Sequence, residues 1–196
     1  MWRLASQSPG LLQNNDKLGR SRAGALPPSR MAGQVARRIF VSSPLLLCPS
    51  AMITVEKITD LRDLDAAFTI RETVFVGEQN VPAEAEYDAH DRAATTRHYL
   101  ARVEGQPAGA ARWRPTENGV KLERFAVLPA FRNQGVGDAL VQQVLADVRA
   151  EAPDAAQVYL HAQLRAIPLY ERTGFHKEGA IFEECDIQHY KMVLGG

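Results

Sequence analysis

The stretch LERFAVLPAFRNQGVGDALVQQVLADVRA, residues 122–150, carries the strongest structural signal in the chain. It begins with an apolar segment that ends at Pro129 and is typical of a buried strand. A glycine-bearing turn, RNQGVG at 132–137, follows. Apolar residues then recur every three or four positions, which predicts an amphipathic helix. A strand therefore leads through a glycine turn directly into a helix.

This turn has the features of an anion site. The first backbone N–H groups of a helix have no partner inside the helix, and the helix dipole places partial positive charge there. Gly135 and Gly137 let a ligand approach the backbone closely, and Arg132 adds a positive charge. A lone Gly-x-Gly is usually an ordinary tight turn, but this context favours a phosphate or pyrophosphate ligand.

Two better-known phosphate motifs fit the turn poorly. A P-loop requires Lys and then Ser or Thr after the last glycine, where this chain has Asp138. A dinucleotide-binding fingerprint requires a third glycine where Leu140 stands, and an acid at the end of the next strand, VYLHAQ. That strand has none.

Charge is distributed unevenly along the 196 residues. Residues 1–51 hold seven of the 23 Lys and Arg but one of the 23 Asp and Glu. This leaves 16 basic and 22 acidic residues in 52–196, a net charge of −6. An acidic domain argues against nucleic acid as a partner.

Residues 1–51 also differ in composition, since they are rich in Ser, Pro, Gly and Arg and lack a sustained period. We expect this segment to lie outside the working protein, with Met52 as its start; a disordered tail and a targeting peptide are the alternatives. The apolar run at 39–48 is broken by Pro44 and is too short to span a membrane, so no membrane insertion is expected.

The cysteines and histidines suggest neither a disulfide framework nor a metal site. Cys48 and Cys185 are the two cysteines, and one of them lies in the N-terminal segment. The five histidines show no close ligand spacing. A cytoplasmic protein without a metal is therefore expected.

Residues 52–196 predict one domain of mixed α/β class. The segment 76–91 loses its period and predicts a polar loop of the kind that carries function. Strands 120–127 and 157–162 flank a helix, so they should be parallel neighbours with a right-handed crossover, whereas the other neighbours should be mostly antiparallel. The remaining expected elements are strands at 53–58, 98–103, 108–113, 175–182 and 187–194, and helices at 61–75 and 164–173.

The pattern Arg-x-x-Gly-x-Gly between a strand and a helix resembles motif A of the GNAT acyltransferases. LYERTGF at 169–175 looks like the Tyr-x-x-x-Gly-Phe element of that superfamily. RETVFVGEQNVP at 71–82, LHAQ at 160–163 and FEECDIQHYKM at 182–192 look like its ElaA/YjcF branch of small bacterial N-acetyltransferases. The resemblance covers nearly all of 52–196. It implies a mostly antiparallel sheet with one splayed parallel strand pair and flanking helices.

The resemblance also implies acetyl-CoA as the acyl donor and assigns residues to it. The backbone of Phe125, Ala126 and Val127 should pair with the pantetheine arm like an added strand. An N–H near Val127 should stabilise the oxyanion. Gln163 should either hydrogen-bond the cofactor arm or cap the next helix. Backbone N–H groups should hold the pyrophosphate at Arg132, Asn133, Gln134, Gly135, Val136 and Gly137.

Tyr170 stands where many GNAT enzymes place the general acid that protonates the departing thiolate; the alternative is a core aromatic residue. Glu123 and Glu78 are the candidates for the base, because a carboxylate can take an amine proton through water. His161 and His189 are lesser candidates. Strand alternation places Glu123 and Arg124 on opposite faces, so that one of them points to the site.

The remaining acids of the 76–91 segment are expected to be solvated: Glu84, Glu86, Asp88 and Asp91. Arg71 and Arg124 lie in apolar surroundings and need charged partners. We hypothesise an Arg–Glu pair, with Glu78 as a candidate partner.

The resulting hypothesis is an N-acetyltransferase that transfers the acetyl group directly to a primary amine on a small molecule, in a ternary complex. Two alternatives remain. One is a GNAT-fold module that binds acyl-CoA without turnover. The other takes its acyl group from a carrier protein, because RETVFVGEQ at 71–79 loosely resembles acyl-homoserine-lactone synthases. Edge strands at the C-terminus make a homodimer an expectation.

Overall fold

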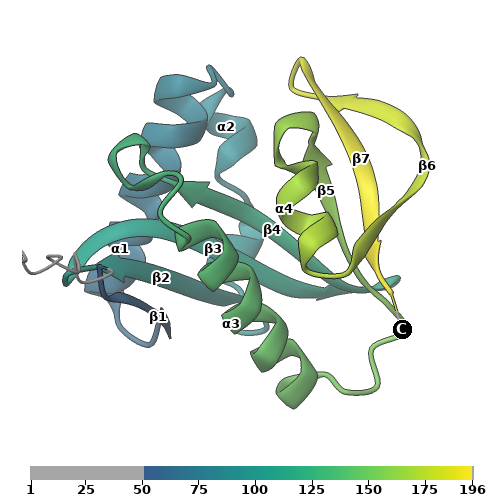
Figure 1. Cartoon of the computed structure of the whole chain (residues 1–196), viewed down its shortest axis with the longest axis horizontal. Helices are drawn as coiled ribbons and strands as arrows, with labels where there is room; N and C mark the ends of the chain where they lie inside the picture. Colours follow the sequence, from purple (N-terminus) through teal and green to yellow (C-terminus); the bar gives the residue numbers. More distant parts are fainter. Residues whose placement is uncertain (1–50, 196) are drawn as a thin grey trace, which may run out of the picture. The chain divides into compact units, whose positions relative to one another are not determined.

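A seven-stranded sheet of order β1-β2-β3-β4-β5-β7-β6 forms the centre of the computed structural model, which describes residues 51–195 (Figure 1). The prediction for residues 1–51 lies outside this range, apart from Ala51. The strands are β1 (Ile53–Lys57), β2 (Arg97–Val103), β3 (Gln106–Thr116), β4 (Gly119–Val127), β5 (Val158–Gln163), β6 (Phe175–Glu184) and β7 (Ile187–Leu194). The α-helices are α1 (Leu61–Arg71), α2 (Ala83–Glu86), α3 (Val136–Glu151) and α4 (Ile167–Arg172).

The strands β4 and β5 form the one parallel pair within the described residues, and all other neighbours are antiparallel. The parallel register covers only Val120–Leu122 against Val158–Leu160. Beyond these residues β4 and β5 continue without pairing to each other, so the strands splay (Figure 1). The predicted mixed sheet with a splayed parallel pair is confirmed.

Helices cover both faces of the sheet. The apolar stripe of α3, which includes Leu140, Val144 and Val148, is buried in the larger core together with Tyr170 of α4. The opposite face carries α1, whose Ala67 and Ile70 are buried in a smaller core. Among residues 51–195, no helix combines the length and apolar character required to cross a membrane.

The segment after α1 is more ordered than the sequence predicts. The α-helical pattern ends at Arg71 and continues as a π-helix, η1 (Glu72–Glu78). The short helix α2 and a 3₁₀ turn, η2 (Ala89–Arg92), then follow. The prediction of a polar loop across 76–91 is therefore wrong, because buried ion pairs and a capping box between Asp88 and Asp91 hold helical turns there.

Candidate active site

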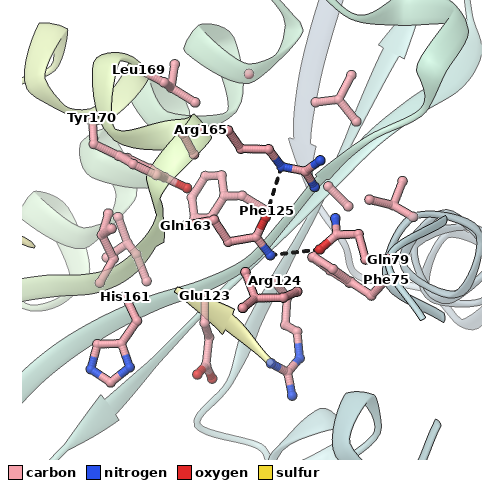
Figure 2. Close-up of a pocket in the computed structure, with 18 of the residues that line it drawn as sticks. Phe75, Gln79, Glu123, Arg124, Phe125, His161, Gln163, Arg165, Leu169 and Tyr170 are labelled. Carbon is pink, nitrogen blue, oxygen red and sulfur yellow. Dashed lines mark hydrogen bonds between the residues drawn. The ribbon is translucent and has the colours of Figure 1, made fainter. Parts of the chain in front are cut away.

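A cavity of about 810 Å³ lies in the gap where β4 and β5 separate. Its wall includes the start of α3, the helix α4 and part of η1 (Figure 2). Most of the predicted site residues line it: Glu123, Phe125, Ala126, Val127, Arg132, Asn133, Gly135, Val136, Gly137, Gln163 and Tyr170. The fold thus brings together residues that are up to 47 positions apart in the chain, from Glu123 to Tyr170.

Two of the predicted residues do not line this cavity. Gln134 is exposed, and its side chain donates a hydrogen bond of 2.8 Å to the carbonyl of Ala130. Glu78 lies beside the glycine turn and accepts two hydrogen bonds from Arg132, at 2.8 and 2.5 Å. This contact lowers the pKa of Glu78, which makes its carboxylate a weaker base.

The start of α3 has the geometry of an anion site. Its N-cap residue Gly135 has a φ of 88°, in the left-handed region, and no side chain caps the helix. A Cβ on Gly137 would lie 3.3 Å from the side chain of Leu169 on α4, so a larger residue would crowd this wall. The Arg132 guanidinium stays beside the turn, because its Nε donates to the carbonyl of Val127 at 3.0 Å.

A β-bulge in β4 changes which side chains reach the cavity. Ala126 pairs with Ala110, but Glu123 pairs with Arg112, so β4 advances three residues where β3 advances two. Arg124 takes a φ of 59° at this bulge. The expectation that only one of Glu123 and Arg124 faces the site is therefore wrong. Both line the cavity because the bulge breaks the strand alternation.

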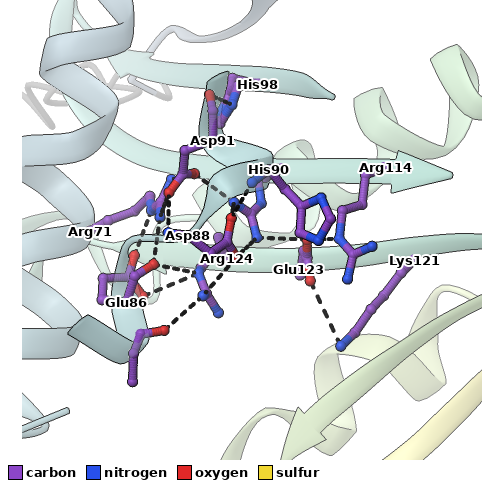
Figure 3. Close-up of polar contacts among 12 residues, drawn as sticks. Arg71, Glu86, Asp88, His90, Asp91, His98, Arg114, Lys121, Glu123 and Arg124 are labelled. Atoms are coloured by element: carbon purple, nitrogen blue, oxygen red, sulfur yellow. Dashed lines mark hydrogen bonds and ion pairs between the residues drawn. The ribbon is translucent and has the colours of Figure 1, made fainter. Parts of the chain in front are cut away.

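The Glu123 carboxylate is already paired with cations. Its Oε1 accepts hydrogen bonds from Arg112 at 2.7 Å and Arg114 at 2.8 Å, and Lys121 lies 3.7 Å from its Oε2 (Figure 3). Oε1 is thus committed to a structural ion pair. The other candidate base, Glu78, is paired with Arg132.

A buried ion network lies next to Glu123 and Arg124, on the side of the cavity wall that they form (Figure 3). Glu86 and Asp91 are 2% and 7% exposed, so the expectation that they are solvated is wrong, while Glu84 is exposed as expected. Arg71 donates to Glu86 and to Asp91 at 2.6 Å each, and these acids replace Glu78 as its expected partner. A charge that leaves water requires such partners.

The network continues to the cavity through two more arginines. Arg112 donates to Asp91 at 2.6 Å and to both oxygens of Asp88, at 2.8 and 2.7 Å. Arg124 lies 3.2 Å from a Glu86 oxygen and 3.4 Å from an Asp88 oxygen. Asp88 is part-buried with two arginine partners, so its expected solvation is also wrong.

Tyr170 combines core packing with an opening to the cavity. Its ring is buried and meets Phe125 and Phe175 edge-on, with centroids 6.0 Å apart in both cases. Figure 2 shows its hydroxyl directed towards Phe125 and Gln163. Burial raises the pKa of Tyr170, which keeps the phenol protonated and able to donate a proton.

Gln163 connects two walls of the cavity. Its Nε2 donates to Oε1 of Gln79 at 2.7 Å, and its Oε1 accepts from Nε of Arg165 at 3.0 Å (Figure 2). Gln163 is the N-cap residue of a 3₁₀ turn, η4 (Leu164–Ala166), but its side chain makes no capping hydrogen bond. The alternative role as a helix cap is thus wrong.

Several lining residues were not predicted, among them Gln79, Arg165, Leu169 and Arg172. Gln79 is 84 positions from Gln163, and no sequence pattern links the two. Arg165 and Arg172 add positive charge around α4, where Arg172 pairs with Asp138 at 3.1 Å. A count of basic residues after strand 157–162 could have suggested them as phosphate neighbours.

Residues 60–195 match the family model described as the acetyltransferase (GNAT) domain. The chain belongs to the GNAT family. It is 37% identical over 134 residues to YjcF of Bacillus subtilis, which is named as an uncharacterized N-acetyltransferase; the match covers 66% of this chain and 91% of YjcF.

Solved structures of this family agree with the fold. An acyl-CoA N-acyltransferase from Pseudomonas aeruginosa is similar with a TM-score of 0.65 and 30% identity, over 74% of this chain and 100% of that one. ElaA of Escherichia coli is similar with a TM-score of 0.67 and 28% identity, over the same shares. The protein is therefore a GNAT acyltransferase of the ElaA/YjcF-like branch.

Proposed function

We propose that the protein transfers the acetyl group of acetyl-CoA to a primary amine on a small molecule, by direct attack within a ternary complex. The observation that carries this proposal is a single cavity that joins the uncapped start of α3 to the buried Tyr170. Such a cavity accommodates a pyrophosphate at one end and a reacting thioester at the other. The gap between β4 and β5 leaves room for an extended arm between them.

Backbone groups of β4 face this gap. The N–H of Leu128 bonds to Ala108 on β3, at 2.9 Å. Because neighbouring residues of an extended strand direct their N–H and C=O groups to opposite sides, those of Val127 face away from β3. The contact from Arg132 to the Val127 carbonyl agrees with this. We propose that the N–H of Val127 stabilises the oxyanion that develops as the amine attacks.

Tyr170 supplies the proton that the departing sulfur requires. The acetyl thioester contributes the activated acyl group, and no covalent acyl-enzyme is needed for the transfer. We place the reaction in the cytoplasm, since residues 52–196 hold a single cysteine, Cys185, and so offer no pair for a disulfide within the domain.

Two alternatives lead to different results in an assay. A module that binds acyl-CoA without turnover would bind acetyl-CoA but release no free CoA with any amine. An enzyme that uses a carrier protein would not need a pyrophosphate site, because a carrier protein has no pyrophosphate. The uncapped helix start therefore favours CoA as the donor.

The test is a calorimetric titration of acetyl-CoA into the full chain and into Gly135→Asp. A Cβ at Gly135 would lie 3.7 Å from Ile53, which is ordinary van der Waals contact. The φ of 88° strains any residue other than glycine there, and the new carboxylate adds a negative charge at the start of α3. Like charges about 4 Å apart repel by about 4 kcal/mol at an effective dielectric constant near 20, and 1.4 kcal/mol is tenfold in affinity. We expect affinity to fall at least about tenfold.

Gly105→Asp is the matched control, because Gly105 also has a positive φ, 78°, and no heavy atom lies within 4 Å of its Cβ position. It adds the same charge in the β2–β3 turn. Equal acetyl-CoA binding by the wild type and Gly135→Asp, with both folded, contradicts the phosphate site. Release of CoA with primary amines is then measured to separate the enzyme from the binding module.

A further inference from the structure

His161 and Glu184 form a pair on the cavity wall that the proposed reaction does not yet use. His161 belongs to β5 and Glu184 ends β6, and both side chains line the cavity. The Nδ1 of His161 lies 2.9 Å from Oε1 of Glu184. The imidazole is partly accessible, with 25% of its side chain exposed.

The contact between His161 and Glu184 determines which of the two side chains carries the shared proton. The hydrogen bond from His161 lowers the pKa of Glu184, so Glu184 is a carboxylate and can only accept. The proton of the contact therefore lies on Nδ1 of His161. In a neutral imidazole this leaves Nε2 as an unprotonated acceptor, which is the arrangement of a general base held by a carboxylate.

The ring is also held by its neighbours. Phe182 meets it edge-on with centroids 4.9 Å apart, and Tyr159 lies 6.1 Å away at a tilt. Rotation of the imidazole would break the Glu184 contact and these ring contacts together. The orientation of the ring is thus defined by packing as well as by the hydrogen bond.

The position on the sheet suits a base. Leu160 and Ala162 of β5 are buried in the core under α3, so the alternate residues His161 and Gln163 lie on the opposite face of the strand. Figure 2 shows His161 and Glu123 extending away from the Tyr170 hydroxyl. An acid and a base at separate parts of one cavity match a reaction in which the amine loses a proton and the sulfur gains one.

We propose that His161 is the general base for the acceptor amine and that Glu184 is its positioning residue. This inference rests on the proposed function. As the nitrogen–carbon bond forms and the carbon–sulfur bond breaks, the ammonium proton of the attacking amine passes to Nε2, directly or through one water. The proton of Tyr170 passes to the sulfur. The imidazolium that results is stabilised by the Glu184 carboxylate.

The two carboxylates considered from the sequence are worse placed for this role. Oε1 of Glu123 accepts from two arginines, and Glu78 lies off the cavity in a bidentate pair with Arg132. Other charged or titratable groups surround the pair from each packed element: Lys121 and Glu123 on β4, Tyr159 on β5, Cys185 in the β6–β7 turn, and His189 and Lys191 on β7.

The first experiment measures release of CoA from acetyl-CoA with spermidine, lysine and benzylamine as acceptor probes. We expect His161→Gln to lower kcat by about 100-fold, within the range of general base catalysis, and to abolish the acidic limb of the kcat/KM profile. The Kd for acetyl-CoA should stay within about twofold. His176→Gln is the matched control, because His176 is exposed on β6.

The second experiment measures the protonation of His161 beside Glu184 in the absence of turnover. ¹⁵N NMR of the wild type should show the His161 proton on Nδ1, and Glu184→Gln should mix the two tautomers and lower kcat by about tenfold. The assignment of His161 as the base is refuted if the wild type carries the proton on Nε2. It is also refuted if the wild type is active and His161→Gln has a kcat within twofold of it. A wild type that releases no CoA with any probe contradicts the proposed function itself, and the role of His161 with it.

Discussion

Replacing Arg71 with Ala tests whether the buried ion network holds the segment beside the cavity. Arg71 is 1% exposed and donates four hydrogen bonds. Two go to carboxylate oxygens of Glu86 and Asp91 at 2.6 Å, one to the Glu86 carbonyl at 3.0 Å and one to the second Asp91 oxygen at 3.1 Å. The variant leaves two buried acids without their main partner.

The expected loss of stability depends on the partners that Glu86 and Asp91 keep in the variant. Removing one partner of a buried ion pair costs about 3–5 kcal/mol, because an uncompensated charge remains. Arg124 still lies 3.2 Å from Glu86, and Arg112 still donates to Asp91 at 2.6 Å. We therefore expect the lower end, a loss of about 3 kcal/mol in the free energy of unfolding, which is roughly 6–12 °C in Tm for a domain of this size.

The assay is urea unfolding of the full chain followed by circular dichroism. Arg62→Ala is the matched control, because Arg62 is an exposed arginine of the same helix and should change stability by less than about 0.5 kcal/mol. A loss of under 1 kcal/mol for Arg71→Ala, with an unchanged m-value, would refute the view that the network orders this segment.

Three further predictions have defined outcomes. Tyr170→Phe should lower kcat about tenfold or more in the CoA-release assay with little change in acetyl-CoA Kd, because the lost proton acts only in the transition state. Burial raises the pKa of Asp91, but the hydrogen bonds and charge of Arg71 lower it by more. The ionised Asp91 therefore stabilises the fold fully above about pH 4, and this stabilisation is lost as pH falls through the lowered pKa of the folded state. Burial raises the pKa of Glu86 despite its partners, so its contribution has the opposite sign and is lost as pH rises. Acid-titrated melts of Asp91→Asn should therefore show a larger loss at pH 7 and a flatter pH dependence than Glu86→Gln. Gly119→Ala should destabilise by roughly 1–3 kcal/mol in a thermal melt, because its φ is 124° and the new Cβ would lie 2.2 Å from the carbonyl oxygen of Gln157.

The fold and the glycine turn at the start of α3 were predictable because their signals are local. The apolar period of 140–148, the glycines at 135 and 137, and the alternation in 98–113 each arise within one element. The crossover rule then makes the strands on either side of α3 parallel neighbours. Backbone geometry follows directly from such patterns, and a bound pyrophosphate would use mainly the backbone.

The bulge at Arg124 was not predictable from alternation. A non-glycine residue with a φ of 59° in a strand leaves no local mark in the sequence, and a single extra residue reverses the side-chain pattern beyond it. Placing only one of Glu123 and Arg124 at the site would be correct for a regular strand. Whether β4 is regular depends on how it pairs with β3, which is a tertiary property.

The ion network was missed for a different reason. Glu86 and Asp91 stand in a polar segment, and their burial is imposed by Arg71 and Arg112, which lie 15 to 21 positions away. One signal was available in AARWR at 110–114, where Arg112 sits between Ala111 and Trp113. A charged side chain in an apolar helix or strand needs a partner, and this holds for Arg112 on β3 as it does for Arg71 on α1.

The two ends of the cavity are therefore built by different interactions. At the start of α3 the groups that we propose for the donor are backbone N–H groups and a glycine conformation, which any sequence compatible with this turn retains. At the other end the wall consists of side chains, with Arg124 holding the carbonyls of Ala85 and Glu86 at 3.1 and 3.2 Å. Substitutions there alter the shape and charge of the wall while the strand and helix order stays the same. We infer that donor recognition depends on the fold, whereas acceptor choice depends on the η1–η2 segment and the ions that fix it.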